Sequence, residues 1–264
     1  MPWQTLILTL SLGGGAFLFS MYGQGGGGLY APVQLLFGTD FQLAAARSQL
    51  YIVLTAISAT LVYRRAGRID WGLAAALEVT ASVGAFAGSR LAGLFPALWL
   101  EILLGVTVLL AAVTMLMEPP TWNFDDNDER LWLWRREVSG RSYTANMLIG
   151  LPAAALIGVL SGLTGTAGGF LKTPLLIMVF GMPADLACGT TAFMVSVTAA
   201  AGFLGRAEVL AGDLPTSILL GVAVFLGAQI GPRVALRTDP AKLQRWFSLL
   251  LGAVGSATLI RALW

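Results

Sequence analysis

Hydrophobic residues occur along the chain in long runs separated by short polar segments. Eight runs are long enough to cross a bilayer as a helix, at about 20 residues per crossing. They cover residues 3–22, 43–63, 71–94, 98–117, 146–164, 186–204, 214–236 and 246–264. Two shorter apolar runs, 29–37 and 170–180, reach only partway through a bilayer. This pattern predicts an all-α polytopic membrane protein.

One long polar stretch, 118–145, divides the chain into a first transmembrane unit, 1–117, and a second, 146–264. Its acidic, basic and tryptophan residues suit a linker at the membrane surface. It contains nothing that resembles a nucleotide-binding cassette, so we do not expect transport driven by attached ATP hydrolysis.

The two units repeat each other. A shift of 142 residues places GGLYAP (27–32) on GGFLKTP (168–174), and a shift of 143 then aligns 43–92 with 186–235. The second alignment includes GAFAGSRLA (84–92) and GAQIGPRVA (227–235). Matches that stay collinear over such a distance indicate two copies of one structural unit.

The distribution of charge predicts how the copies are oriented. The loop at 64–70 carries three arginines, whereas its counterpart at 206–213 balances Arg206 with Glu208 and Asp213. Conversely, the turn at 94–97 is uncharged and 233–245 is basic. Because positive loops stay on the cytoplasmic side, the copies are expected to have inverted topology. The linker would then be cytoplasmic and both termini outside.

Each copy contains a glycine-rich interruption within an apolar stretch, at Gly23–Pro32 and Gly165–Pro174. Broken helices at membrane depth occur where protein or an aqueous cavity satisfies the backbone. A pseudo-twofold axis would bring two half-helix N-termini together, and helix N-termini attract anions. The pattern predicts a carrier that binds a small anion through backbone amides of Gly25, Gly26, Gly27, Gly28, Gly168 and Gly169.

Composition narrows the function further. Charged residues make up 11% of the chain and hydrophobic residues 56%, against about 25% charged residues in a soluble domain. The net charge of +2 is too small to indicate nucleic-acid binding. The chain has no histidine and one cysteine, which excludes histidine-ligated haem, histidine-based triads and internal disulfides. We expect no metal, no cofactor and no enzymatic activity.

Two cations lie next to the short apolar segments. Lys172 precedes Pro174 by two residues, and its partner in the repeat is Tyr30. A lysine at the centre of a membrane helix costs about 2.5–3.5 kcal/mol, so it either lies beside the anion or extends to the membrane surface. Arg47, aligned with Thr190, either contacts substrate oxygens or anchors its helix at the interface.

Small polar residues follow the short segments in both copies. Ser48, Gln49, Thr190 and Thr191 either line the anion site or form hydrogen bonds between helices. Glu78 lies inside an apolar run, so it is a candidate for proton coupling.

Other residues favour structural roles. Arg90 and Arg233 are equivalent in the repeat and are expected to cap helix carbonyls. The equivalent pairs Gly84/Gly88 and Gly227/Gly231 have the spacing of close helix contacts.

The sequence resembles the sulfite exporter TauE/SafE family of sulfite and organosulfonate permeases over nearly its whole length. The resemblance lies in GQGGGGLYAPVQLLFG, GLTGTAGGFLKTPLLIMVFG, ACGTTAFMVSVTAAAGFLG and GAQIGPRVA. It implies export of sulfite or small sulfonates, whereas the residues alone indicate only an anion. Family members commonly have a Thr-Ser pair where this chain has Thr190-Thr191, and its first half has Arg47-Ser48 instead. This departure leaves open whether both halves contribute equally to the site.

We therefore expect a secondary transporter in the plasma membrane of a bacterium, working by alternating access and either passive or linked to protons. The alternatives are a carrier of thiosulfate, an organosulfonate or a carboxylate, an anion channel, a membrane protein that uses its glycines only for packing, and an intramembrane enzyme. The sequence leaves the coupling ion and the oligomeric state open, including a homodimer.

Overall fold

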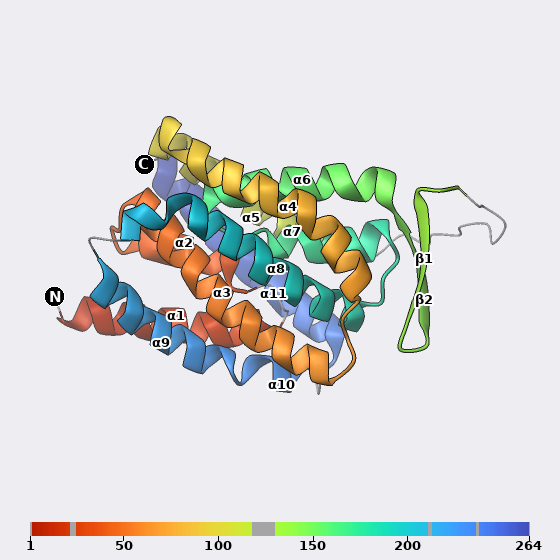
Figure 1. The fold of residues 1–264 in the computed structure, drawn as a ribbon. Coiled ribbons are helices and arrows are strands. Elements are labelled where there is room, and N and C mark those ends of the chain that lie inside the picture. Colours follow the sequence, from red (N-terminus) through yellow and green to blue (C-terminus); the bar gives the residue numbers. More distant parts are fainter. Residues whose placement is uncertain (1, 22–24, 118–129, 211–212, 236–237, 264) are drawn as a thin grey trace.

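A computed structural model describes residues 2–21, 25–117, 130–210, 213–235 and 238–263 (Figure 1). The described chain is almost entirely helical, with one two-stranded sheet. The helices are α1 (Pro2–Met21), α2 (Gly27–Leu36), α3 (Phe41–Arg65), α4 (Trp71–Leu91), α5 (Ala97–Leu116), α6 (Met147–Thr164), α7 (Gly169–Pro174), α8 (Ala184–Arg206), α9 (Leu214–Ala228), α10 (Gly231–Ala235) and α11 (Pro240–Leu263). Short 3-10 turns cover Ala92–Leu94 and Ala207–Leu210, a π-helical turn covers Leu175–Val179, and the strands are β1 (Leu133–Val138) and β2 (Arg141–Asn146).

Seven helical segments in the described chain are long and apolar enough to cross a membrane. They correspond to seven of the eight predicted crossings, and the eighth coincides with α1, in which Leu6–Met21 forms a shorter apolar helix. Large hydrophobic side chains such as Leu10, Val83 and Leu110 are exposed on the outside of the bundle, as lipid contact requires. The prediction of an all-α multi-pass membrane protein is confirmed.

The predicted polar linker contains a β-hairpin, which sequence analysis did not predict. β1 and β2 pair antiparallel from Leu133↔Asn146 to Val138↔Arg141. Ser139 and Gly140 form the turn, both with positive φ (53° and 74°), as a two-residue type I′ turn requires. The earlier part of the linker, 118–129, lies outside the described residues.

This hairpin marks one end of the bundle, and we call it the hairpin end. α1 begins and α11 finishes at the opposite end (Figure 1). α6 starts directly from β2, whereas α1 starts at the opposite end. α3 runs toward the hairpin end, and its counterpart in the repeat, α8, runs away from it. α1 and α6, and likewise α3 and α8, therefore run in opposite directions.

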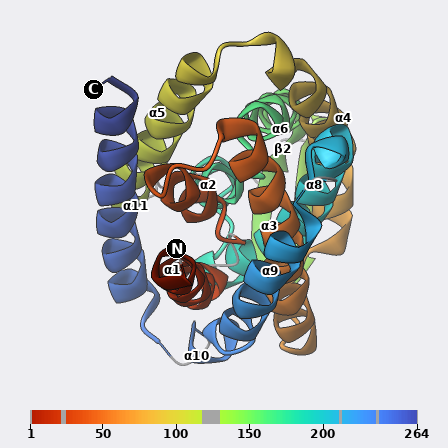
Figure 2. The same cartoon turned by 90° about the vertical axis from the view of Figure 1, so that its left-hand side faces the viewer.

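Each half of the chain provides a helix to the other half. α4 packs against α6 and α8, and α9 packs against α1 and α3. α5 and α11 pack together along one side of the bundle (Figure 2). The two glycine pairs make these contacts close: a Cβ on Gly84 would lie 2.6 Å from the carbonyl oxygen of Ala155 on α6, and one on Gly227 would overlap the carbonyl oxygen of Gly13 on α1. Close packing at both glycine pairs is confirmed.

Of the two equivalent arginines, only Arg233 caps a carbonyl as expected. Its Nη1 donates to the Gln229 carbonyl at 3.0 Å. Arg90 instead pairs with the exposed Glu208, at 3.2 Å.

Candidate functional site

The two glycine-rich interruptions have the same backbone geometry. Gly26 and Gly168 are the N-caps of α2 and α7, with left-handed φ values of 82° and 65°. The Gly26 carbonyl accepts from the amides of Leu29 and Tyr30 at 3.0 and 3.1 Å, and the Gly168 carbonyl accepts from the equivalent pair at 3.0 and 2.9 Å. Residues 22–24, at the start of the first interruption, lie outside the described residues.

The N-terminal turns of α2 and α7 meet inside the bundle. Gly27 lies so close to Thr166 that an added Cβ would overlap the Thr166 carbonyl oxygen, and a Cβ on Gly28 would lie 3.5 Å from the Phe170 ring. α2 is enclosed by α1, α3 and α11, as Figure 2 shows. The structure thus brings Gly27 and Gly28, selected from the first half, against the residues that flank Gly168 and Gly169 in the second half.

Two donors at this junction are unused. The amides of Gly169 and Phe170, the first two of α7, donate to no other residue that the structure describes. Both residues are buried. Helix starts leave such amides without intrahelical partners.

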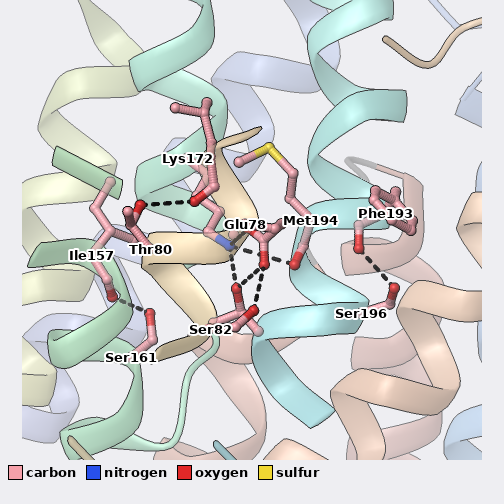
Figure 3. A network of polar contacts seen from close by, with 12 residues as sticks. Glu78, Thr80, Ser82, Ile157, Ser161, Lys172, Phe193, Met194 and Ser196 are labelled. Carbon is pink, nitrogen blue, oxygen red and sulfur yellow. Dashed lines mark hydrogen bonds and ion pairs between the residues drawn. The ribbon is translucent and has the colours of Figure 1, made fainter. Parts of the chain in front are cut away.

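Next to the junction, Lys172 forms a buried ion pair with Glu78 (Figure 3). The Lys172 side chain is 0% exposed and that of Glu78 4%. Nζ also donates to Thr198 Oγ1 at 2.5 Å, and the same hydroxyl donates to Glu78 Oε2 at 2.5 Å. Lys172 therefore does not extend to the membrane surface, and Glu78 balances its charge.

The first half contains an uncharged version of this arrangement. Tyr30, the counterpart of Lys172, forms a hydrogen bond of 2.9 Å with Thr55, the counterpart of Thr198. Gly221 occupies the position equivalent to Glu78. The two halves share the hydrogen bond between short helix and long helix but not the charges.

Arg47 and Thr190, equivalent in the repeat, both contact the start of a helix from the other half. Arg47 is buried, forms an ion pair with Asp213 before α9, and donates from Nε to Ser217 Oγ at 3.2 Å. Thr190 Oγ1 accepts from the amide of Asp70, before α4, at 3.0 Å. Both residues thus fasten helices across the two halves.

The remaining polar candidates differ in whether their side chains have hydrogen-bond partners. Ser48 Oγ accepts from Gln34 Nε2 at 3.2 Å, and Gln49 Nε2 donates to Ser89 Oγ at 3.2 Å.

Thr191 is fully buried, and its hydroxyl has no partner among the described residues. It lies one turn before Val195, and a Cβ on Gly25 would lie 2.8 Å from Val195 Cγ1. Since residues four apart share a helix face, Thr191 lies on the face of α8 that approaches the first interruption.

Comparison with known proteins identifies the family. The family model described as Sulfite exporter TauE/SafE matches residues 7–258. The chain belongs to the sulfite exporter TauE/SafE family. This family is one of membrane transporters, and the TauE/SafE chain described here is a multi-pass membrane protein.

Relatives of this TauE/SafE chain occur in distant organisms. It is 26% identical over 264 residues to a protein of Xylella fastidiosa named "Probable membrane transporter protein", covering 98% of this chain and 97% of the relative. It is 23% identical to "Probable membrane transporter protein YunE" of Bacillus subtilis, covering 81% of each chain. Identity to "Sulfite exporter TauE/SafE family protein 3" of Arabidopsis thaliana is 31%, covering 58% of this chain and 34% of the relative. No solved structure gives a significant match.

In this TauE/SafE chain the hairpin is fastened to the bundle through Asp70, which sequence analysis did not select. Arg136 of β1 donates to both carboxylate oxygens of Asp70, at 2.9 and 2.6 Å, and the Tyr143 hydroxyl of β2 donates at 2.6 Å. Burial opposes ionisation of Asp70, but these hydrogen bonds and the Leu73 amide hold its pKa below the ordinary value of 3.8. A second contact joins Asp185, at the start of α8, to Arg68 and Arg141.

Proposed function

We propose that this TauE/SafE chain is a secondary transporter that exports sulfite or a closely related sulfur oxyanion, and not an enzyme. The anion is bound where the N-terminal turns of α2 and α7 meet. The observation that carries this proposal is the contact between Gly27 and Thr166, which brings two helix starts together in the interior. Helix N-termini favour anions through free amides and the positive end of the helix dipole.

The chemistry of the junction suits a small oxyanion. The amides of Gly169 and Phe170 provide donors, and glycine allows the anion to approach the backbone closely. The unpartnered hydroxyl of Thr191 provides a further donor from α8. Arg47 and Thr190 act less directly, because their side chains are engaged at the starts of α9 and α4.

The buried pair of Lys172 and Glu78 supports proton coupling. An anion at the junction attracts the Lys172 ammonium and so competes with Glu78 for it. A buried carboxylate that loses its partner is costly, and uptake of one proton by Glu78 removes that cost. Anion and proton would then cross together. Thr198, which contacts both side chains, would hold Lys172 and Glu78 in position while Lys172 shifts from Glu78 to the anion.

The direction of the helices supports alternating access. We propose that residues 1–117 and 146–264 are inverted-topology repeats joined by the 118–145 linker, and that movement between them exposes the junction to each side in turn. The hairpin end carries Arg64 and Arg65 at the end of α3, Arg68 on the α3–α4 loop, and Arg136 and Arg141 on the hairpin. By the positive-inside rule, the hairpin end faces the cytoplasm.

The test is sulfite flux into proteoliposomes that contain the purified protein, measured at several sulfite concentrations with and without a pH gradient. We expect saturable flux that responds to the gradient and is abolished by Gly27→Leu, while Gly14→Leu retains it, because a Cβ on Gly14 meets nothing within 4 Å. Rapid flux without saturation would indicate a channel. Absence of flux from folded protein would rule out sulfite, and direct measurement of thiosulfate, organosulfonate and carboxylate flux would then identify another anion.

A further inference from the structure

Arg206, the last residue of α8, is a buried cation with unused donors. The residue is 4% exposed. Nη2 donates to the Gly162 carbonyl, while Nε and Nη1 have no hydrogen-bond partner among the described residues. No carboxylate in the described chain pairs with it either. A buried charge without a partner is strongly destabilising, so this arrangement is suited to a ligand that supplies negative charge.

The polar groups around Arg206 form one connected network. Ser89 Oγ donates to the same Gly162 carbonyl at 3.2 Å, and Gln49 Nε2 donates to Ser89 Oγ at 3.2 Å. Gln49 Oε1 has no partner among the described residues. α3, α4, α6 and α8 thus each contribute to a polar cluster that contains unused hydrogen-bonding atoms.

The cluster lies between the junction and the end of the bundle opposite the hairpin. α6 runs away from the hairpin end, and a Cβ on Gly168, the N-cap of α7, would contact Ser161 and Ile157, which precede Gly162 along α6. α8 begins at the hairpin end, and Arg206 is its last residue. An anion that leaves the junction toward the opposite end therefore passes the level of Arg206.

The first half shows that the carbonyl contact does not need a cation. Tyr63 is the counterpart of Arg206 in the repeat, and its hydroxyl donates to the Met21 carbonyl at 2.8 Å. Met21 is the counterpart of Leu163, whose carbonyl also lies 3.5 Å from Arg206 Nη2. A neutral phenol therefore makes the equivalent contact at the end of α1. The charge and extra donors of Arg206 must serve something other than this contact.

We propose that Arg206 is a second anion-binding residue, which holds the oxyanion between the junction and the end of the bundle opposite the hairpin. The proposal rests on the transport function above for the identity of the ligand. Guanidinium suits this role because it stays charged and offers several donors in a plane to oxyanion oxygens.

The test compares Arg206→Lys and Arg206→Met with the wild type in phosphate-free detergent micelles, by calorimetric titration with sulfite and by thermal unfolding without ligand. Arg206→Lys keeps the charge and one donor for the Gly162 carbonyl but loses the planar extra donors. We expect its Kd for sulfite to rise about tenfold, equivalent to about 1.4 kcal/mol, and Arg206→Met to bind more weakly still. Arg90→Met is the matched control, because Arg90 lies toward the same end, is half exposed and pairs with exposed Glu208; its Kd should equal that of the wild type.

The outcomes separate this proposal from the transport function. If Arg206→Lys binds sulfite as the wild type does and only its unfolding temperature changes, Arg206 merely caps α6 and the proposal is wrong. If the wild type binds no sulfite, sulfite transport is wrong, and titration of the same variants with sulfate, thiosulfate and phosphate tests Arg206 directly. A wild type that binds none of these oxyanions overturns both. Addition of phosphatidylglycerol should leave the sulfite Kd unchanged; competition by the lipid would assign Arg206 to a lipid phosphate and overturn the proposal.

Discussion

Lys172 on α7 and Glu78 on α4 form a buried ion pair that joins the second half of the chain to the first. Removing one member leaves an uncompensated charge in the interior, which costs about 3–5 kcal/mol. We therefore expect Lys172→Met to lower the free energy of unfolding by about that amount and to abolish transport. Unfolding in detergent micelles and flux in proteoliposomes measure the two effects.

The double variant Lys172→Met/Glu78→Met is the control for this prediction. It should recover most of the lost stability, because replacing a buried pair by apolar side chains is often neutral, yet it should still fail to transport. Transport by the double variant at the wild-type rate would show that the pair serves only stability.

Tyr30→Phe tests the uncharged counterpart. It removes the hydroxyl that contacts Thr55, but Thr55 Oγ1 still donates to the Tyr51 carbonyl at 2.8 Å. We expect a loss of about 0.5–1.5 kcal/mol in unfolding free energy and flux close to that of the wild type. Thr198→Val, the comparison in the second half, should reduce flux strongly, because Thr198 contacts both members of the ion pair.

Gly27→Ala tests the junction of the two short helices. Its Cβ would overlap the Thr166 carbonyl oxygen, so α2 and α7 must move apart. We expect a loss of about 1–3 kcal/mol in stability, as for overpacked interiors, together with a higher KM for the anion. Gly14→Ala on α1 should change neither quantity, and a Gly27→Ala variant with wild-type KM would argue against an anion site at this junction.

Asp70 predicts a dependence of stability on pH. Its folded-state pKa lies below the ordinary carboxyl value of 3.8, so its contribution is fully present above that value and is lost as pH falls through the folded pKa. Asp70→Asn should lower the unfolding temperature at neutral pH, and the difference from the wild type should begin to shrink below about pH 4 and be lost only once the pH is under the folded-state pKa. A difference that stays constant down to pH 3 would show that the carboxylate charge does not fasten the hairpin.

Sequence alone accounts for much of the fold and for part of the site. The length and hydropathy of the apolar runs predicted the long helices, and the clusters of glycine predicted both interruptions. Lys172 and Glu78 were each selected, but their pairing was not, because they lie 94 residues apart and in different halves. A repeat alignment shows which residues are equivalent; it does not show that α4 and α9 pack against the opposite half.

The packing of α4 and α9 against the opposite half also decides which carboxylate each arginine contacts. The charge count of the 206–213 loop set Arg206 against Glu208 and Asp213, but such a count does not say which charges form ion pairs. In the structure Glu208 pairs with Arg90 and Asp213 with Arg47, and no carboxylate among the described residues pairs with Arg206. The β-hairpin was not predicted although Ser139-Gly140 gives a turn signal, because its two short strands are rich in charged and polar residues and lack a clear apolar alternation.

Because α4 and α9 each pack against the opposite half of the chain, the order in which the halves are synthesised matters for folding. During synthesis α4 enters the membrane before α6, α7 and α8 exist, so Glu78 must be inserted before Lys172 has been translated, at a cost of about 2.5–3.5 kcal/mol. A chain consisting of one half alone would leave its interrupted helix without the helix that covers it. On the proposed inverted-repeat arrangement, a chain of that length would need a second copy, inserted in the reverse orientation, to supply the covering helix.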